Sequence, residues 1–237
     1  PPNLSWDYVD LRAEWAPYLR VPVVATNDAN AAALGEMHFG AARGMRDFIV
    51  ITLGTGLGSG IVVGGKLVYG STGFAGELGH LIVDPEGRLC GCGRKGCLET
   101  YASATGILRT VGELLEAGSL ATELRDLPRA ELTSRRVFEA AGRGDELAQE
   151  AFRITGEILG RKLADAVVFT SPEAIILFGG LAGAGEMIFG PTRRAMEANL
   201  FPVFKGTVRL LSSGIQGNAA ILGAAALGWE ALGEGKA

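Results

Sequence analysis

The chain places all three of its cysteines between positions 90 and 97, shortly after His80, one of only two histidines. This cluster constrains the fold, because Zn²⁺ is held tetrahedrally by Cys and His side chains and three Cys with one His is a common structural set. The glycines between the cysteines let the backbone bend so that the thiolates can converge. His80, Cys90, Cys92 and Cys97 are therefore predicted to bind a structural Zn²⁺, with no position left open for a catalytic water.

A cysteine cluster of this kind can also occur without a metal. An odd, closely spaced set of cysteines in a chain without a secretion signal argues against disulfide bonds. A loop with buried free thiols stays as the alternative to metal. The second histidine, His38, lies in an Ala-rich segment and is interpreted as a packing or surface residue.

The charge balance gives no reason to expect an anionic partner. The chain has 22 basic and 26 acidic residues and a net charge of -4, so neither nucleic acid nor an anionic membrane is an expected partner. No apolar stretch reaches the ~18 residues of a membrane span, and no basic region precedes an apolar run at the N-terminus. We expect a cytoplasmic protein, and the start at Pro1-Pro2 suggests that upstream residues are missing.

Hydrophobic runs and turn residues predict alternating strands and helices. Predicted strands cover residues 21–26, 48–53, 61–63, 67–69, 173–178 and 207–211. Predicted helices cover 11–18, 29–39 (from an Asp cap), most of 103–170 with breaks near Gly118 and Pro128, 185–199 and 218–232. Residues 70–100 are predicted to form a loop. This order favours an α/β fold with a mixed sheet.

Two glycine-rich runs follow predicted strands. The turn at residues 54–60 can cradle phosphate with its backbone amides, helped by the hydroxyl of Thr55 or Ser59. It precedes a strand, which excludes the dinucleotide-binding fingerprint. The run that begins at Gly179 and Gly180 suits a nucleobase or ribose, because ligands of open α/β sheets bind beyond the carboxyl ends of strands. The alternatives are a plain hairpin turn and a tight strand–helix connection.

Three carboxylates lie at positions that suit general-base catalysis or sugar binding. Asp28 follows a predicted strand and begins a predicted helix, which suits a general base for a hydroxyl nucleophile; the alternative is an ordinary N-cap. Glu77 and Glu99 flank the cysteine cluster, and acidic residues on a loop stiffened by metal suit a sugar. The alternative for these two is a solvated surface pair.

In order and spacing, four segments resemble the ROK family, which groups repressors, open reading frames and kinases on an actin-like, ribonuclease-H-like ATPase fold. They are residues 27–36 (NDANAAALGE), 53–60 (LGTGLGSG), 76–80 (GELGH) and 90–99 (CGCGRKGCLE). The cysteine segment together with Gly-Glu-x-Gly-His is highly specific. Residues 96–104 (GCLETYASA) look most like the glucokinase branch. The resemblance covers nearly the whole chain and implies a mixed sheet flanked by helices, with a zinc-braced loop.

The resemblance implies an ATP-dependent hexose kinase that converts glucose to glucose 6-phosphate with Mg²⁺ and ATP. Asp28 would be the general base for the sugar 6-hydroxyl, and His80 would face both the Zn²⁺ and the sugar. The expected sugar-binding residues are Asn27, Asp28, Glu77, His80 and Glu99. The expected ATP-binding residues are Gly54, Thr55 and Gly56 at the phosphates and Gly179 and Gly180 at the adenosine. A homodimer or homotetramer is expected as well.

One part of the family pattern is missing. The family opens with Asp-x-Gly-x-Thr on a hairpin that helps to hold Mg-ATP, followed by a loop that closes over the sugar, and neither occurs here. Residues 1–44 would be the C-terminal remnant of an N-terminal α/β domain. Residues 45–237 would be the large C-terminal α/β domain, with the zinc loop at 76–99 and a last helix that can pack back on the N-terminal domain. We expect this chain alone to be inactive and a full-length parent to be active.

Two competing functions stay open. The first is a sugar-responsive transcriptional repressor of the same family, with a DNA-binding helix-turn-helix upstream. The second is a purely structural zinc module. Asp28 and both glycine runs favour the kinase, because a repressor needs no phosphate sites. The sequence does not separate glucose from N-acetylglucosamine, N-acetylmannosamine, mannose or fructose.

Overall fold

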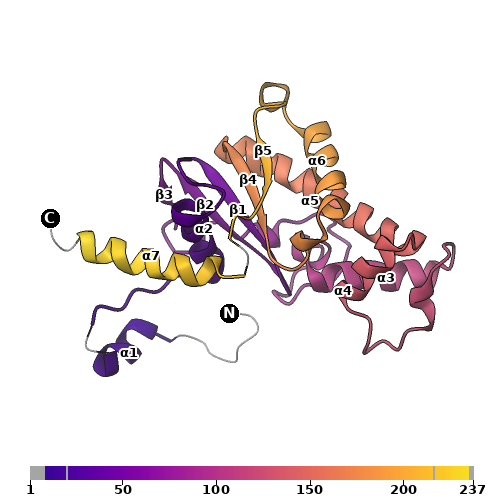
Figure 1. Cartoon of the computed structure of the whole chain (residues 1–237), viewed down its shortest axis with the longest axis horizontal. Coiled ribbons are helices and arrows are strands. Elements are labelled where there is room, and N and C mark those ends of the chain that lie inside the picture. The colour runs from indigo at the N-terminus through magenta and orange to yellow at the C-terminus, as the bar shows by residue number, and fades with distance from the viewer. Residues whose placement is uncertain (1–8, 20, 216, 235–237) are drawn as a thin grey trace.

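A five-stranded mixed sheet forms the centre of the protein, whose structure is a computed structural model that describes residues 9–19, 21–215 and 217–234 (Figure 1). Its strands are β1 (Phe48–Leu53), β2 (Leu57–Val63), β3 (Lys66–Leu67), β4 (Ala174–Phe178) and β5 (Arg209–Ser212), in the order β3-β2-β1-β4-β5. The β1–β2 and β2–β3 pairs are antiparallel, whereas β1–β4 and β4–β5 are parallel. The mixed sheet predicted from the sequence is confirmed.

Helices cover both faces of this sheet (Figure 1). One face carries Ile49, Ile51 and Ile175 and packs against the larger group of helices, which comprises α3 (Ala104–Ala117), α4 (Ser134–Gly142), α5 (Glu146–Thr170) and α6 (Glu186–Asn199). The other face carries Phe48 and Val50 and packs against α2 (Asp28–Phe39), on which α7 (Ala219–Glu234) lies. Successive strand residues point to opposite faces, so the continuous apolar run of β1 supplies both cores.

Small residues bring β2, α2 and α7 close together. A Cβ added at Gly60 would lie 2.7 Å from the Ala33 Cβ, and one added at Gly223 would lie 1.6 Å from the Ala31 carbonyl oxygen. Only glycine allows backbones to approach this closely. The Ala-rich sequence of α2 therefore lets the helix lie directly on the sheet, with its N-terminus near the glycine turn after β1.

Several predicted boundaries are wrong. The glycine turn spans only residues 54–56, because β2 begins at Leu57, and β3 is limited to Lys66–Leu67. Residues 21–26 form no strand in the described structure, where Val21 and Val24 are exposed. A β-branched run forms a strand only when a neighbouring strand completes its backbone hydrogen bonds, and no described strand pairs with this segment. The short helix before it, α1 (Leu11–Leu19), is present as predicted.

The remaining predicted elements are confirmed with shifts of one to a few residues at their ends. Two short 3₁₀ turns, η1 (Leu78–His80) and η2 (Leu98–Thr100), interrupt the predicted loop of residues 70–100. None of the helices among the described residues is long and apolar enough to span a membrane.

Candidate active site

The predicted metal ligands converge. The ligand atoms of His80, Cys90, Cys92 and Cys97 all lie within 4.8 Å of one another. The Cys92 and Cys97 Sγ atoms are 3.6 Å apart, and the Cys90 Sγ is 3.8 Å from the His80 Nδ1. Two sulfurs bound tetrahedrally at about 2.3 Å from Zn²⁺ would be separated by about 3.8 Å. The donor set and its spacing therefore fit a four-coordinate metal site.

Tight turns create this convergence. The Cys90 amide donates to the Arg94 carbonyl at 2.9 Å, and the Gly93 amide donates back to the Cys90 carbonyl at 3.0 Å. Gly96 has a φ of +73°, and a Cβ there would lie 1.6 Å from the Asp84 carbonyl oxygen. No other residue fits this position without a backbone shift, so glycine is required where the loop returns to bring Cys97 toward Cys90.

The three thiols differ in their electrostatic environment. Burial raises the pKa of Cys90 and Cys97. The exposed Cys92 behaves in the opposite way, because the Arg94 backbone amide donates a hydrogen bond to its sulfur and lowers its pKa to about 6. A thiolate is the form that ligates metal, so Cys92 is the thiol most readily available as a ligand.

His80 faces the cysteine cluster with one ring nitrogen and a carboxylate with the other. Its Nδ1 lies near the Cys90 sulfur, and its Nε2 lies 3.9 Å from Glu77 Oε2. The residue ends η1, which contacts β2 closely because a Cβ on Gly79 would lie 2.2 Å from the Leu57 carbonyl oxygen. The imidazole can thus contact a metal and a second ligand at the same time.

Glu99 lies between the cysteine cluster and the glycine turn. Its Oε1 accepts from the Cys90 thiol at 2.9 Å and lies 3.8 Å from His80 Nδ1. Its Oε2 would be 2.7 Å from a Cβ placed on Gly56. The Ser103 hydroxyl donates to the Glu99 carbonyl at 2.6 Å and also caps α3. This position is therefore fixed from both the loop and the helix.

One cleft of about 440 Å³ gathers most of the predicted site residues. We call it the central cleft. It is lined by Asp28, Thr52, residues 54–58, Glu77, His80, Glu99, Phe178, Gly179 and Ala220. These residues come from the start of α2, the ends of β1 and β4, the glycine turn and the start of β2, η1 with its N-cap, η2 and the start of α7. The cleft therefore lies beyond the carboxyl ends of the parallel strands, where ligands of α/β sheets bind.

Asn27 and Asp28 have separate positions at the start of α2. Asn27 is the N-cap, because its Oδ1 accepts from the Asn30 amide at 2.7 Å; the predicted Asp cap is wrong. The Asn27 side chain does not line the central cleft. Asp28 is the first helical residue, and its Oδ1 accepts from the Ala29 amide at 2.9 Å. Asp28 is exposed and lines the cleft, so its carboxylate is accessible to a ligand there.

The carbonyl groups of the glycine turn are used to hold it in place. The Gly54 carbonyl accepts from the Ala104 amide, and the Thr55 carbonyl accepts from the Thr105 hydroxyl, both at 2.8 Å. The amides of Thr55 and Gly56 have no acceptor within the described part of the chain. Ser59 is not a phosphate ligand as suggested, because its buried hydroxyl donates to the Gly76 carbonyl.

A second pocket adjoins the central cleft and shares Phe178 and Gly179 with it. We call it the glycine pocket; it is lined by residues 177–180, Ala182, Gly183, Ser212, Ser213 and Gly217. Gly179 has a φ of +105°, and a Cβ there would lie 2.6 Å from the Leu53 carbonyl oxygen. The two residues predicted to contact the adenosine therefore line different cavities. Gly179 lines both the central cleft and the glycine pocket, and Gly180 lines the glycine pocket alone.

A comparison with known families decides where this site belongs. A model of the ROK family matches residues 1–230. The chain belongs to the ROK family. The membership predicted from the motifs is confirmed, and the mixed sheet is that of the actin-like ATPase fold.

Curated relatives of this ROK chain include enzymes and regulators. A glucokinase from Thermotoga maritima is 39% identical over 235 residues, which are 98% of this chain and 74% of the relative. A xylose repressor from Caldicellulosiruptor bescii is 32% identical over 226 residues, which are 95% of this chain and 57% of the relative. A solved structure of a Streptomyces griseus ROK glucokinase with glucose and AMPPNP has a TM-score of 0.84 and 38% identity; the match covers 95% of this chain and 74% of that one.

The site of this ROK chain includes residues that the sequence analysis missed. Thr52 and Ala220 line the central cleft. Thr52 could have been noticed in the sequence, since it carries the one hydroxyl in the apolar run of β1. In the structure its Oγ1 accepts from the Gly58 amide at 3.1 Å. Ala220 could not have been noticed, because a small residue at a helix start is common.

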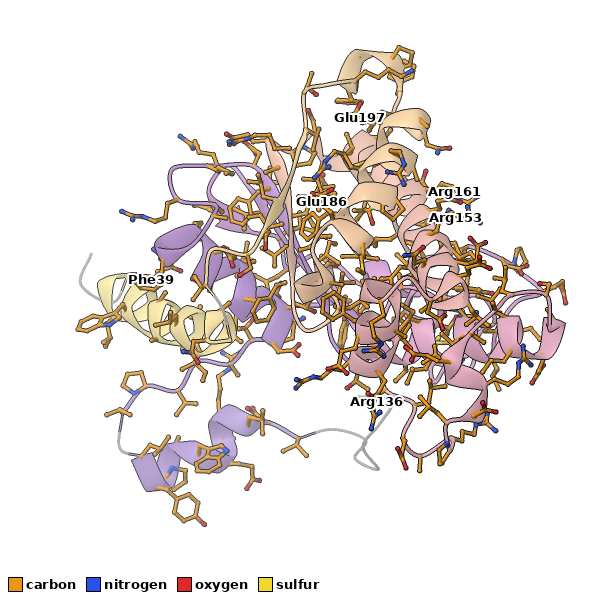
Figure 2. All side chains as sticks on the ribbon, turned by 45° about the vertical axis from the view of Figure 1, so that its right-hand side comes forward. Phe39, Arg136, Arg153, Arg161, Glu186 and Glu197 are labelled. Carbon is orange, nitrogen blue, oxygen red and sulfur yellow. The ribbon has the colours of Figure 1, made fainter. Side chains whose placement is uncertain are left out.

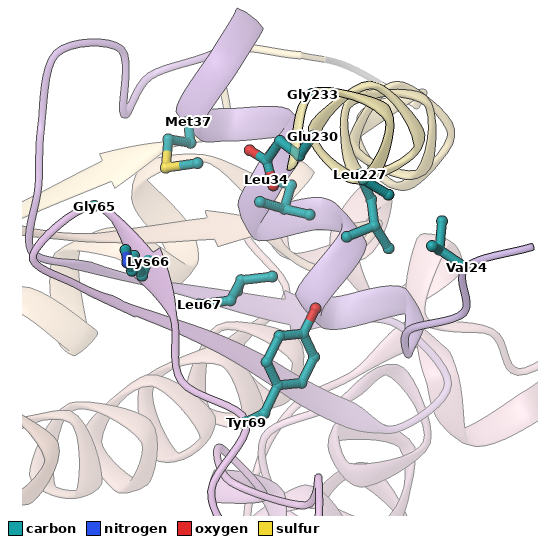
Figure 3. A pocket seen from close by; sticks show the side chains of 11 residues that line it. Val24, Leu34, Met37, Gly65, Lys66, Leu67, Tyr69, Leu227, Glu230 and Gly233 are labelled. Carbon is teal, nitrogen blue, oxygen red and sulfur yellow. The ribbon is translucent and has the colours of Figure 1, made fainter. Parts of the chain in front are cut away.

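The cavity of largest volume among those described lies elsewhere. It is a groove of about 680 Å³ between α2, α7 and the β2–β3 hairpin, and Figure 3 shows Leu34, Leu67, Tyr69 and Leu227 around it. Its lining is mostly apolar, with Lys66 and Glu230 at its edge. None of the predicted site residues lines this groove, so the chemistry belongs to the smaller central cleft.

Proposed function

We propose that the central cleft is the active site of an ATP-dependent hexose kinase that phosphorylates glucose on its 6-hydroxyl. The observation that carries this proposal is the meeting of Asp28, Glu77, His80 and Glu99 with the glycine turn in one cleft. The similarity to curated glucokinases and to a glucokinase structure with glucose and AMPPNP supports the same activity.

The acidic side of the cleft suits a sugar. Carboxylates accept hydrogen bonds through several lone pairs, and a neutral imidazole offers one donor and one acceptor. Glu77, His80 and Glu99 all line the central cleft, and His80 lies within 4 Å of both carboxylates. We assign these three residues to the hydroxyls of glucose. Asn27 is assigned there as well, although its Oδ1 already caps α2.

A metal stiffens this side of the cleft. His80, Cys90, Cys92 and Cys97 would hold Zn²⁺, with all four positions filled by protein. A bound Zn²⁺ would fix the loop and orient the His80 ring, because a ligating imidazole is held through one nitrogen. The three thiols and one imidazole are ligands that Zn²⁺ prefers.

The opposite side of the cleft suits the nucleotide. The amides of Thr55 and Gly56, which have no acceptor among the described residues, can donate to phosphate oxygens. A Cβ at Gly54 or Gly180 would meet no atom within 4 Å, so packing inside the protein does not require glycine there. Close approach of a ligand to the backbone explains those two glycines. The phosphates are assigned to Gly54, Thr55 and Gly56, and the adenosine to Gly179 and Gly180.

Asp28 is assigned as the general base. Its carboxylate would take the proton from the glucose 6-hydroxyl as this oxygen forms a bond to the γ-phosphorus of ATP. The bond from the γ-phosphorus to the bridging oxygen breaks, and ADP leaves with that oxygen. Mg²⁺ bound with ATP supplies neutralisation of the phosphate charge. The protein contributes position: the start of α2 fixes Asp28, and η1 and η2 fix the sugar.

A sugar-sensing repressor is the second candidate. The xylose repressor matches 95% of this chain at 32% identity, so the fold alone does not separate the two functions. A sensor needs the sugar side of the cleft and no turnover. The accessible Asp28 carboxylate and the open glycines at the phosphate side favour the kinase.

The test is a coupled ADP-release assay on the protein expressed from its complete gene. Glucose, mannose, fructose, N-acetylglucosamine and N-acetylmannosamine are supplied in turn, and sugar binding is measured in parallel by calorimetry. We expect ADP release with glucose at the highest kcat/KM. Tight sugar binding without ADP release from any sugar would favour the repressor, and preference for an acetylated sugar would correct the substrate.

A further inference from the structure

Arg88 has a buried guanidinium group beside the proposed sugar site. Its side chain is only 9% exposed, although it carries a full positive charge. Its Nε and Nη2 donate to the Glu113 carboxylate at 2.8 and 2.6 Å. Its Nη1 donates to the Thr100 and Gly106 carbonyls at 2.6 and 3.0 Å, and Nη2 also donates to the Thr110 hydroxyl at 2.9 Å. All five guanidinium donors are therefore used.

The partners of Arg88 come from the segments that support the sugar site. Thr100 ends η2, which contains Glu99, and the Thr100 hydroxyl donates to the Cys97 carbonyl at 2.7 Å. Gly106, Thr110 and Glu113 belong to α3, whose start also holds the glycine turn. Arg88 therefore ties the cysteine loop to η2 and to α3 at once.

An aromatic ring fixes the direction of the Arg88 side chain. The guanidinium carbon lies 4.2 Å from the centroid of the Tyr101 ring, and the Arg88 amide donates to the Tyr101 hydroxyl at 3.2 Å. A Cβ at Gly87 would lie 2.1 Å from the same hydroxyl. Gly87 and Arg88 therefore both pack closely against Tyr101, which directly follows η2.

The guanidinium group itself donates to none of the predicted metal ligands, and the network reaches Cys97 only at its backbone carbonyl, through Thr100. The guanidinium bonds go to Thr100, Gly106, Thr110 and Glu113, whereas the metal ligands are His80 and the three cysteines. With a metal bound, the loop would therefore be held on two sides, by the metal on one and by Arg88 on the other. Glu99 lies between the two, because it contacts Cys90 through its carboxylate and precedes Thr100.

We propose that Arg88 is a positioning residue for the sugar, which holds η2 so that Glu99 faces the central cleft. The inference rests on the proposed function of the cleft. Arg88 acts through Glu99 and touches neither substrate. Lysine cannot replace it fully, because a single ammonium lacks the planar set of five donors that reaches four different groups.

The test compares Arg88→Met and Arg88→Lys with the wild type, using glucose titration calorimetry, kcat and KM for both substrates, and bound zinc. Arg88→Met should weaken glucose binding roughly tenfold, the loss expected when charged hydrogen bonds to one turn are removed. The KM for ATP and the zinc content should stay as in the wild type. Arg88→Lys should recover part of the glucose affinity.

Arg153→Met is the matched control. Arg153 is likewise an arginine paired with carboxylates, those of Glu150 and Glu157, but it lies on α5 away from the central cleft (Figure 2). Its replacement should leave glucose affinity unchanged. If Arg88→Met folds poorly, Glu113→Gln serves as the second variant, because the Glu113 side chain is 59% exposed and only the ion pair with Arg88 is lost.

The outcomes separate this inference from the proposed function. Unchanged glucose affinity in Arg88→Met, or in Glu113→Gln where that variant replaces it, would overturn the positioning role. An equal loss of zinc, ATP affinity and glucose affinity in Arg88→Met would overturn it as well, because it would show a general structural role. A wild-type protein that binds no hexose would overturn the proposed function and this inference together.

Discussion

Two roles are assigned to the Asn27 side chain. Its Oδ1 caps α2, whereas the family resemblance implies a contact with the sugar. A cap of this kind contributes about 1 kcal/mol to stability, and Asp preserves it while Ala does not. The position next to Asp28 means that loss of the cap would also loosen the carboxylate.

We expect Asn27→Ala to lower the free energy of unfolding by about 1 kcal/mol, because the Asn30 amide loses its acceptor. Asn27→Asp should keep the wild-type stability. Urea denaturation of both variants measures this. Equal destabilisation by Ala and Asp would mean that the cap is not what Asn27 supplies, and a higher glucose KM in both would point to the sugar contact.

At the scale of elements, the loop from η1 to η2 carries both the proposed metal ligands and the proposed sugar contacts. We expect Cys92→Ser to lose bound zinc and glucose affinity together, because the remaining three ligands leave the loop less ordered and His80 less well oriented. Metal analysis and glucose calorimetry on the same preparation check this. Lys95→Ser is the control, since Lys95 is in the same turn but is no ligand. Wild-type glucose affinity without zinc would contradict the role assigned to the metal.

The contact between α2 and β2 is a second element that can be tested. Gly60→Ala places a Cβ 2.7 Å from both the Ala29 carbonyl oxygen and the Ala33 Cβ. We expect it to destabilise the protein by about 1–3 kcal/mol through overpacking. Gly112→Ala is the control, because a Cβ there meets nothing within 4 Å and α3 should gain about 1 kcal/mol. Thermal unfolding of both variants compares them; equal stability of Gly60→Ala and the wild type would show that α2 can move away from the sheet.

The sequence predicted this architecture better at the centre than at its edges. The strands β1 and β4 were predicted well, because an apolar, β-branched run buried on both faces has a clear pattern. Residues 21–26 have the same pattern but pair with no described strand, and pairing is not visible in local sequence. Gly58 and Gly60 were interpreted as turn residues, although they serve the close contact with α2.

The site was predictable where its chemistry is unusual. Cysteine clustering predicted four side chains whose ligand atoms converge in the structure, and the carboxylates Asp28, Glu77 and Glu99 all line the central cleft. Arg88 could not be predicted, because its partners lie 12 to 25 positions away and its burial depends on the docking of α3. The suggestion that the Ser59 hydroxyl binds phosphate was wrong for the same reason, since only the fold shows that this hydroxyl donates to the Gly76 carbonyl.

At the scale of the whole molecule, the central cleft depends on segments from both ends of the chain. α2 carries Asp28 and α7 carries Ala220, and these two helices lie together on one face of the sheet (Figure 1). The division into two domains, residues 1–44 and 45–237, stays a prediction. The assembly into a homodimer or homotetramer stays a prediction as well. The chain spans about three quarters of the Thermotoga glucokinase, so whole-protein assays belong with the complete gene product.

The most direct test of the account is glucose binding and ADP release measured side by side for the wild type and Asp28→Asn. The substitution keeps the shape and the bond to the Ala29 amide but removes the proton acceptor. We expect glucose affinity within about twofold of the wild type and a kcat at least ~100-fold lower, since general-base catalysis contributes about that much or more. Wild-type turnover in Asp28→Asn would contradict the assignment of Asp28 as the base and, with it, the proposed mechanism of the cleft.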